Sequence, residues 1–235
     1  MVTSLTTTFD GIFYVTSAVC VNGRLSIYTD EERFHQTAET IRSIKRHCPN
    51  SMIYLIDVSD DPNCIIYLRE LARLDAQVIY LGDKEPIRSY SQHGMKSQGE
   101  LTALMAFLDW FDQQDITAKR IYKVSGRYHL NEHFKLGLEY ENQFVFLKSE
   151  NSWMPPGMQD VTGMRKFFET RLYHMDFNLL PVYKAAVPKM LEVCNTYNVN
   201  IEHAIYHVLY GQNVVELDRV GLTGNIAPSG ELKND

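Results

Sequence analysis

The chain has 235 residues, of which 45% are hydrophobic and 22% charged, a composition that argues against a disordered, collagen-like or coiled-coil protein. Its formal net charge is −6 and it contains no dense run of lysine or arginine, so nucleic acid is not expected as a partner. A small anionic ligand stays compatible with this charge, because it needs only two or three local cations and some backbone N–H groups.

The first half of the chain alternates predicted strands with predicted helices. Short apolar runs rich in β-branched and aromatic residues predict strands at 12–19, 52–57 and 77–81. Between them, apolar or small residues recur every three or four positions from 34 to 48, and a second helical stretch covers 64–74. This alternation is typical of a parallel sheet with right-handed crossovers, so we predict an α/β fold with a mostly parallel, Rossmann-like sheet flanked by helices.

The elements of the second half are predicted from the same two signals, apolar runs for strands and a three- to four-residue apolar spacing for helices. Its expected elements are a helix at 101–111, strands at 120–125 and 143–148, helices at about 184–197 and 201–210, and a strand at 214–220. Residues 82–98 and 149–164 are expected to be long irregular loops, since both carry prolines and glycines without a sustained period, and the tail after 220 is expected to be a loop. No repeat or linker divides the chain, so we predict one domain over 1–235.

The cysteines are widely spaced and include no CxxC pair: Cys20, Cys48, Cys64 and Cys194. Reduced thiols of a cytoplasmic protein are therefore expected. The apolar stretch 11–21 follows Asp10 rather than a basic segment and is too short to span a bilayer, so we expect neither a signal peptide nor a transmembrane helix.

Candidate binding residues follow the predicted strands, because ligands of open α/β sheets bind beyond the carboxyl ends of the strands. The residues at these ends are Thr16, Ser17, Asp57, Ser125, Gly126 and Arg127. Asp57 could accept hydrogen bonds from a ribose or a base edge, or could cap its own turn. Gly126 permits close backbone approach and Arg127 a bidentate grip on phosphate, and the alternative is a surface turn with a solvated arginine.

The chain lacks three common catalytic motifs and contains one short match to a zinc motif. No GxGxxG follows the first strand, and neither GxxxxGK[ST] nor GxSxG occurs, which argues against a dehydrogenase, a P-loop NTPase and a hydrolase. The segment "HLNEH", from His129 to His133, matches a zinc motif of two histidines with a glutamate base. Gly126 and Asn131 do not favour the helix that such a site requires, so we predict no metal-ligating residue, and a metalloprotease is kept as a third hypothesis.

Glu202 and His203 open the predicted helix at 201–210. The helix dipole favours a carboxylate in this first turn, which by itself is a sufficient structural reason for Glu202. If this end of the helix faces the ligand, Glu202 could instead take a proton from an acceptor hydroxyl, with His203 as the rival base.

Taken together, several segments resemble glycosyltransferases of the GT-A type, particularly small ones from bacteria and their phages. They are "VTSAV", "ERFHQTAETIRSIKRHCPNSMIYLIDVSDD", "YKVSGRYHL", "IEHAIYHVL" and "GLTGNIAPSG", and their order and spacing carry the resemblance. The resemblance implies transfer of a hexose from a nucleotide sugar, with UDP as the nucleotide, to a hydroxyl of a glycan or another acceptor, as in glycan or lipopolysaccharide-type synthesis. It assigns nucleotide binding to about 10–130 and acceptor binding to about 131–235.

The resemblance also assigns residues. Thr16, Ser17, Arg33 and Asp57 would surround the nucleotide, and "IEHAIYHVL" would carry the base of inverting members. Where the family usually has an Asp-x-Asp metal motif, this chain has Ser125, Gly126 and Arg127.

A second departure is that the acidic pair which usually opens the base helix is here Glu202 and His203, and the two departures leave three questions open. Arg127, with Lys96 as a second candidate, would neutralise the leaving diphosphate in place of a metal, although Mn²⁺ or Mg²⁺ could still take part. The choice between Glu202 and His203 as base, and with it inversion or retention, is open. A non-catalytic nucleotide- or sugar-binding module on the same fold is the competing hypothesis.

Overall fold

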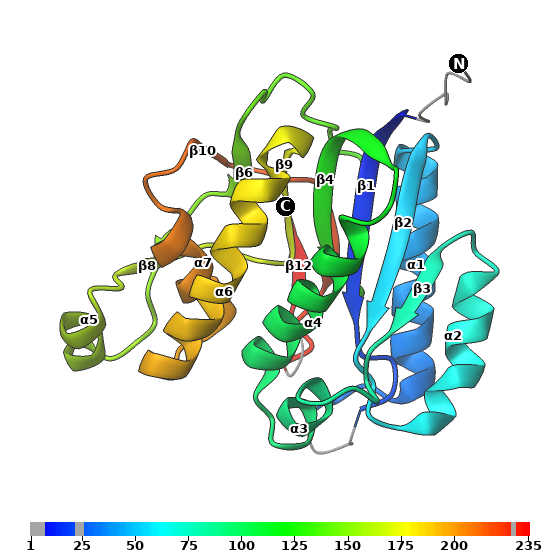
Figure 1. Cartoon of the computed structure of the whole chain (residues 1–235), viewed down its shortest axis with the longest axis horizontal. Helices are drawn as coiled ribbons and strands as arrows, with labels where there is room; N and C mark the ends of the chain where they lie inside the picture. Colours follow the sequence, from blue (N-terminus) through cyan, green and yellow to red (C-terminus); the bar gives the residue numbers. More distant parts are fainter. Residues whose placement is uncertain (1–7, 22–25, 227–228) are drawn as a thin grey trace.

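The computed structural model describes residues 8–21, 26–226 and 229–235, and a seven-stranded sheet forms its centre (Figure 1). In spatial order its strands are β10 (Val214–Leu217), β6 (Phe144–Leu147), β9 (Leu172–Asp176), β4 (Thr117–Ser125), β1 (Thr8–Ser17), β2 (Ser51–Asp57) and β3 (Gln77–Tyr80). Neighbouring strands pair in parallel except at β9, which is antiparallel to both β4 and β6. The predicted α/β fold with a mostly parallel sheet is confirmed.

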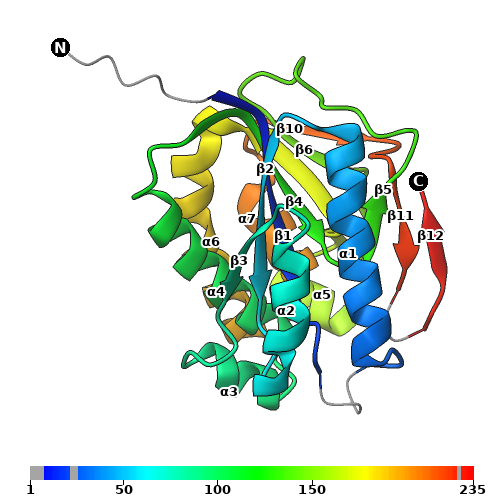
Figure 2. The same ribbon diagram turned by 90° about the vertical axis from the view of Figure 1, so that its right-hand side faces the viewer.

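Helices cover both faces of this sheet (Figure 2). One face carries α1 (Asp30–His47) and α2 (Ile65–Ala72), and the other carries α4 (Lys96–Phe111), α6 (Leu180–Tyr197) and α7 (Ile201–Leu209). Each face has its own buried apolar cluster, which is what alternating inward positions of a doubly covered sheet produce. Among the described residues, no helix has both the length and the apolar character needed to cross a bilayer.

The remaining elements are short. They are the 3₁₀ helices η1 (Pro62–Cys64) and η2 (Phe177–Leu179), α3 (Ile87–Gln92), α5 (Pro156–Thr162), the three-stranded sheet of β12 (Leu232–Asn234), β11 (Leu222–Asn225) and β5 (Tyr128–Leu130), and the two-stranded sheet of β7 (Glu150–Asn151) and β8 (Lys166–Phe167).

Local chemistry fixes where α1 begins. The Thr29 hydroxyl accepts a hydrogen bond from the Glu32 backbone N–H (3.2 Å), and the Glu32 carboxylate accepts one from the Thr29 N–H (2.7 Å). This reciprocal capping box satisfies two donors that the helix itself leaves unpaired. It sets Arg33 into the first turn of α1, at the carboxyl edge of the sheet.

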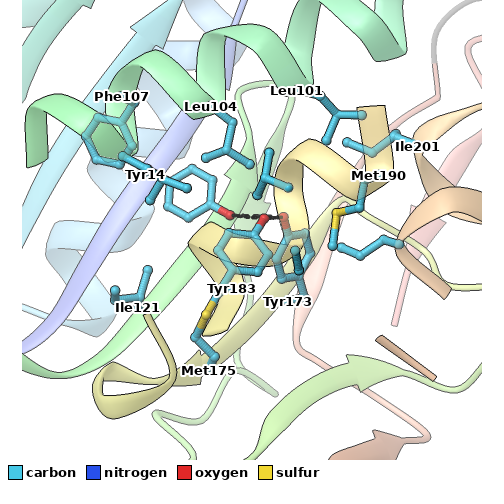
Figure 3. Packing of buried hydrophobic residues seen from close by; sticks show 14 of the residues in the cluster. Tyr14, Leu101, Leu104, Phe107, Ile121, Tyr173, Met175, Tyr183, Met190 and Ile201 are labelled. Atoms are coloured by element: carbon cyan, nitrogen blue, oxygen red, sulfur yellow. Dashed lines mark hydrogen bonds between the residues drawn. The ribbon is translucent and has the colours of Figure 1, made fainter. Parts of the chain in front are cut away.

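Three tyrosine hydroxyls join the strands to α6 in the core (Figure 3). The Tyr14 hydroxyl on β1 lies 2.9 Å from those of Tyr173 on β9 and Tyr183 on α6, and the latter two are 2.5 Å apart. All three side chains are buried, and each hydroxyl can both donate and accept, so the group satisfies itself without water. It anchors β9 against β1, and β9 starts directly after Arg171 at the edge where the strands end.

The sequence prediction was wrong for three segments that were expected to be irregular. Residues 82–98 contain α3 and the first turn of α4, and 149–164 contain β7 and α5. Pro156 stands at the start of α5, where its missing N–H costs nothing, and Gly163 ends it at φ +72°, so both residues bound a helix rather than exclude one. The tail expected as a loop contains β11 and β12, which pair with each other and with β5.

Strand β9 was missed altogether. Its sequence contains His174, whose side chain is buried because its Nδ1 accepts a hydrogen bond from the buried Arg120 Nε of β4 (2.9 Å). Burial and the neighbouring Arg120 charge hold the pKa of His174 well below its ordinary value. The apolar residues Leu172, Tyr173 and Met175 of β9 are interrupted by this histidine, so the short strand has neither a continuous apolar run nor a clear alternation from which it could be predicted.

Candidate active site

A cleft of about 490 Å³ opens at the carboxyl ends of β1 and β4. Its walls come from those strand ends, from the first turns of α1, α4 and α7, and from the segment 167–171. Eight of the ten residues predicted from the sequence line it: Thr16, Ser17, Arg33, Lys96, Ser125, Gly126, Arg127 and Glu202. The two that do not line it are Asp57 and His203.

Gly126 allows the turn after β4 to pass closely by the end of β1. Its N–H donates to the Thr16 carbonyl oxygen (2.8 Å), and a Cβ there would lie 3.2 Å from both this oxygen and the Thr37 hydroxyl. A larger residue would push the turn away from the sheet, so the glycine serves close approach. The turn brings Arg127 towards Arg33 of α1.

Arg33, Lys96 and Arg127 form a cationic group in the cleft. Burial, followed by repulsion from Arg127, lowers the pKa of Arg33 to about 10. Burial, followed by repulsion from Arg127 and Arg33, lowers the pKa of Lys96. The Arg33 Nε donates to the Ala18 carbonyl oxygen (2.6 Å), whereas the buried Arg127 Nε has no hydrogen-bond partner within the described part of the chain. Three clustered cations with an unsatisfied buried donor are what an anion would stabilise.

An acidic group lies in the same cleft and was mostly missed by the sequence analysis. Glu100 pairs with the ammonium of Lys123 (2.9 Å), and Glu169 pairs with Arg171 (2.6 Å). Lys123 is only 2% exposed and also donates to the Ser125 hydroxyl (2.8 Å) and the Thr170 carbonyl oxygen (2.7 Å). The available signal was a lysine inside the buried strand "RIYKVS", because a charge is almost never fully buried without partners.

Glu202 is the third carboxylate of this group. It forms no ion pair with any described residue, and its Oε1 lies 3.4 Å from the donating Thr170 hydroxyl. Burial raises its pKa, and repulsion from Glu100 and Glu169 adds to this increase while Lys123 opposes it. The Ile201 N–H donates to the Ser97 hydroxyl (3.0 Å), which docks the start of α7 on the start of α4. A carboxylate with a raised pKa and no strong partner is suited to accept a proton.

His203 occupies a different environment. It is 1% exposed, its Nδ1 lies 2.6 Å from the Asn200 amide oxygen, and its Nε2 lies 2.8 Å from the Ser152 hydroxyl. Because an amide oxygen only accepts, these contacts assign the proton to Nδ1 and make Nε2 the acceptor of the Ser152 hydroxyl. Burial lowers the pKa of His203, so the neutral ring connects α7 to the segment before α5.

Asp57 lies behind the cleft wall with no exposed surface. Its Oδ2 accepts hydrogen bonds from the Ser17 hydroxyl (2.8 Å) and the Val19 N–H (3.0 Å), and its Oδ1 accepts one from the Ser59 N–H (2.9 Å). Burial raises its pKa, although these hydrogen bonds oppose the increase. These contacts are those of a carboxylate that caps its own turn, and Asp57 in addition holds the loop after β1.

We expect Asp57→Ala to lower the free energy of unfolding by roughly 3 kcal/mol, because two buried N–H donors and the half-buried Ser17 hydroxyl would lose their acceptor. Urea unfolding at neutral pH measures this change. Asp83→Ala, at an exposed position, is the matched control and should stay within about 0.5 kcal/mol of the parent. A loss below about 1 kcal/mol for Asp57→Ala would show that the carboxylate is not needed to hold these loops.

The "HLNEH" segment does not form the helix that the zinc motif needs. His129 lies in strand β5, and Glu132 and His133 lie in the turn that follows it. Among the described residues, no three His, Cys, Asp or Glu side chains are grouped so that they could hold a metal ion. The cationic part of the cleft does not fit a metal ion either, since Arg33, Lys96 and Arg127 would repel a divalent cation.

No protein-family model matches the chain, and no curated protein matches its sequence. The solved structures that share its fold at low identity include two glycosyltransferases. The bifunctional glycosyltransferase WbbM superposes with a TM-score of 0.53 at 11% identity, covering 89% of this chain and 39% of its own. The galactosyltransferase LgtC, solved with donor and acceptor sugar analogs, gives a TM-score of 0.50 at 10% identity, covering 87% of this chain and 72% of its own.

These similarities concern the fold. The chain thus has the fold of GT-A-type glycosyltransferases, as the sequence resemblance implied, and it spans about two fifths of the length of WbbM.

Proposed function

We propose that the protein is a glycosyltransferase that moves a sugar from a nucleotide-sugar donor, with UDP as its nucleotide, to an acceptor hydroxyl. The observation that carries this proposal is one cleft that holds both a cationic group and a carboxylate, Glu202, with no ion pair to any described residue, on a glycosyltransferase fold. As diphosphate leaves a sugar, the transition state needs positive charge at the diphosphate and a base at the acceptor hydroxyl.

The cationic group supplies the first requirement. Arg127 would direct its guanidinium N–H groups at the diphosphate, and Arg33 and Lys96 would add charge without a large reorganisation, because the protein already holds them together. Thr16, Ser17, Ser125 and the Gly126 backbone would line the donor, with Asp57 fixing Ser17 from behind.

Glu202 supplies the second requirement. Its carboxylate would accept the proton of the acceptor hydroxyl as the sugar bond forms, and the positive end of α7 would help keep it ionised. His203 would hold Glu202 in place from the next position of the helix. A base in this role is what an inverting transfer requires, and this assignment favours inversion.

Nucleotide binding followed by turnover tests the proposal. UDP, ADP and GDP would be compared by thermal shift, and a ligand at 100 times its Kd should stabilise the protein by about 2.7 kcal/mol. UDP-glucose, UDP-galactose and UDP-N-acetylglucosamine would then be assayed for release of UDP. Nucleotide binding without UDP release from any donor would favour the non-catalytic binding module, and no stabilisation by any nucleotide would contradict both hypotheses.

We expect UDP binding to persist in EDTA, with a Kd changed less than about twofold. The reason is that the side chains placed for the diphosphate are themselves cations and leave no need for a bridging metal. Calorimetric titration of UDP into protein with EDTA, and again with Mn²⁺, measures the effect. Loss of UDP binding on chelation would show that metal ligands exist that this assignment has overlooked.

A further inference from the structure

An exposed tryptophan stands at the rim of the cleft. Trp153 is 57% exposed and lines the same cleft as Glu202. A large aromatic side chain left in water at a binding site costs solvation free energy, which a ligand that covers it recovers. Its position therefore indicates that a bound ligand contacts this side chain.

Trp153 is nevertheless held rigidly on its protein side. Its ring meets the ring of Phe167 at 4.2 Å between centroids with an interplanar angle of 69°, and that of His203 at 4.6 Å and 75°. Such steep aromatic contacts fix the orientation of the indole while leaving surface for a ligand.

The backbone around Trp153 is fixed as well. The Ser152 N–H donates to the Arg165 carbonyl oxygen (2.9 Å), and the Ser152 hydroxyl bonds His203 Nε2 (2.8 Å). The Gln159 side chain of α5 donates to the Met154 carbonyl oxygen (2.7 Å). A pre-oriented aromatic platform loses little conformational entropy when a ligand covers it.

The surroundings of the platform are polar. Glu169 and Arg171 pair with each other in the cleft (2.6 Å), and Thr170 lies between them in sequence and donates to Glu202. A lipid chain would desolvate these charges without replacing their hydrogen bonds. A pyranose ring combines an apolar C–H face, which fits an indole, with hydroxyls, which fit a carboxylate and a guanidinium.

We infer that Trp153 is the stacking platform of the acceptor, and that the acceptor is a carbohydrate whose pyranose ring lies on the indole with a hydroxyl towards Glu202. This inference rests on the proposed glycosyl transfer and narrows its acceptor to a class. Contact through His203 links the platform to the helix turn that carries Glu202, so the acceptor and its base are positioned by one unit.

Calorimetry with simple sugars tests the inference. Methyl β-glucoside, methyl β-galactoside and lactose would be titrated at millimolar concentrations into the protein saturated with UDP. We expect binding by at least one sugar, weakened about tenfold or more in Trp153→Ala and largely retained in Trp153→Tyr, which keeps an aromatic face. Val161→Ala, which removes a 76% exposed side chain of α5 outside the cleft, is the matched control and should bind like the parent.

Two further measurements make the result decisive. UDP affinity, measured separately, should be the same in Trp153→Ala and the parent. If neither protein binds UDP, the result counts against the proposed function rather than against the platform. The inference would be overturned if none of the sugars binds, or if the parent and Trp153→Ala bind sugar equally well. It would also be overturned if phosphatidylcholine vesicles or a serine-containing peptide bind in place of sugars and depend on Trp153.

Discussion

Replacing Glu202 by glutamine is expected to lower the rate of sugar transfer by about 10²- to 10⁴-fold, the usual loss when a general base is removed. Glutamine keeps the size and polarity of the side chain and cannot accept a proton. Glu100 and Glu169 are poorly placed to substitute, because each is already ion-paired, with Lys123 and Arg171 respectively. Steady-state release of UDP in the presence of an acceptor measures the loss.

The UDP affinity of Glu202→Gln should stay within about twofold of the parent, since Glu202 belongs to the acidic group and not to the cationic one. Glu132→Gln is the matched control, because Glu132 is exposed in the "HLNEH" turn, and it should transfer sugar at the parent rate. Normal turnover by Glu202→Gln would leave Glu202 as no more than a helix-start charge.

The raised pKa of Glu202 adds a pH dependence with a defined sign. Activity should fall as the pH is lowered through this raised pKa, because the base becomes protonated at a higher pH than an ordinary glutamate. The stability of the fold has the opposite pH dependence. Folded Glu202 binds its proton more tightly than unfolded Glu202, so the free energy of unfolding falls as the pH rises from the unfolded-state pKa to the folded-state pKa. Glu202→Gln should therefore unfold at no lower temperature than the parent at neutral pH.

The sheet and its edge could be predicted because periodicity and strand ends are local signals. Apolar runs predicted β1, β2, β3, β4, β6 and β10. The rule that ligands bind at strand ends indicated Thr16, Ser17 and the turn from Ser125 to Arg127, all of which line the cleft. The family resemblance indicated Lys96, and the position at a helix start indicated Glu202. Both residues line the cleft.

What escaped the sequence depends on contacts between distant segments. Nothing local indicates that Asp57 would be enclosed by the loop after β1, or that the His203 ring would be occupied by Asn200 and Ser152. Strand β9 was hidden for the same reason, since its buried His174 depends on Arg120 of another strand. Proline and glycine around α5 were interpreted as breakers, whereas their positions at the two ends make them helix boundaries.

Replacing Arg127 by alanine is expected to weaken UDP binding by roughly 10- to 150-fold, which corresponds to the 1.5 to 3 kcal/mol of a charge-assisted hydrogen bond. Its buried Nε lacks a hydrogen-bond partner among the described residues, so a diphosphate oxygen would satisfy a donor that the protein leaves unpaired. Calorimetric titration of UDP into both proteins measures the difference. Arg46→Ala, which removes a 62% exposed arginine of α1, is the matched control and should bind UDP like the parent.

Uridine and a lysine variant separate the diphosphate contact from general damage. Uridine lacks the diphosphate, so its affinity should be the same in Arg127→Ala and the parent, whereas equal losses for uridine and UDP would indicate a disturbed fold. Arg127→Lys should fall between the two, because lysine restores the charge without the planar fork. Removing Arg127 also relieves its repulsion of Arg33 and Lys96, so the variant without nucleotide should be no less stable than the parent. A variant that is stable, binds uridine and loses UDP would identify Arg127 as a ligand of the diphosphate.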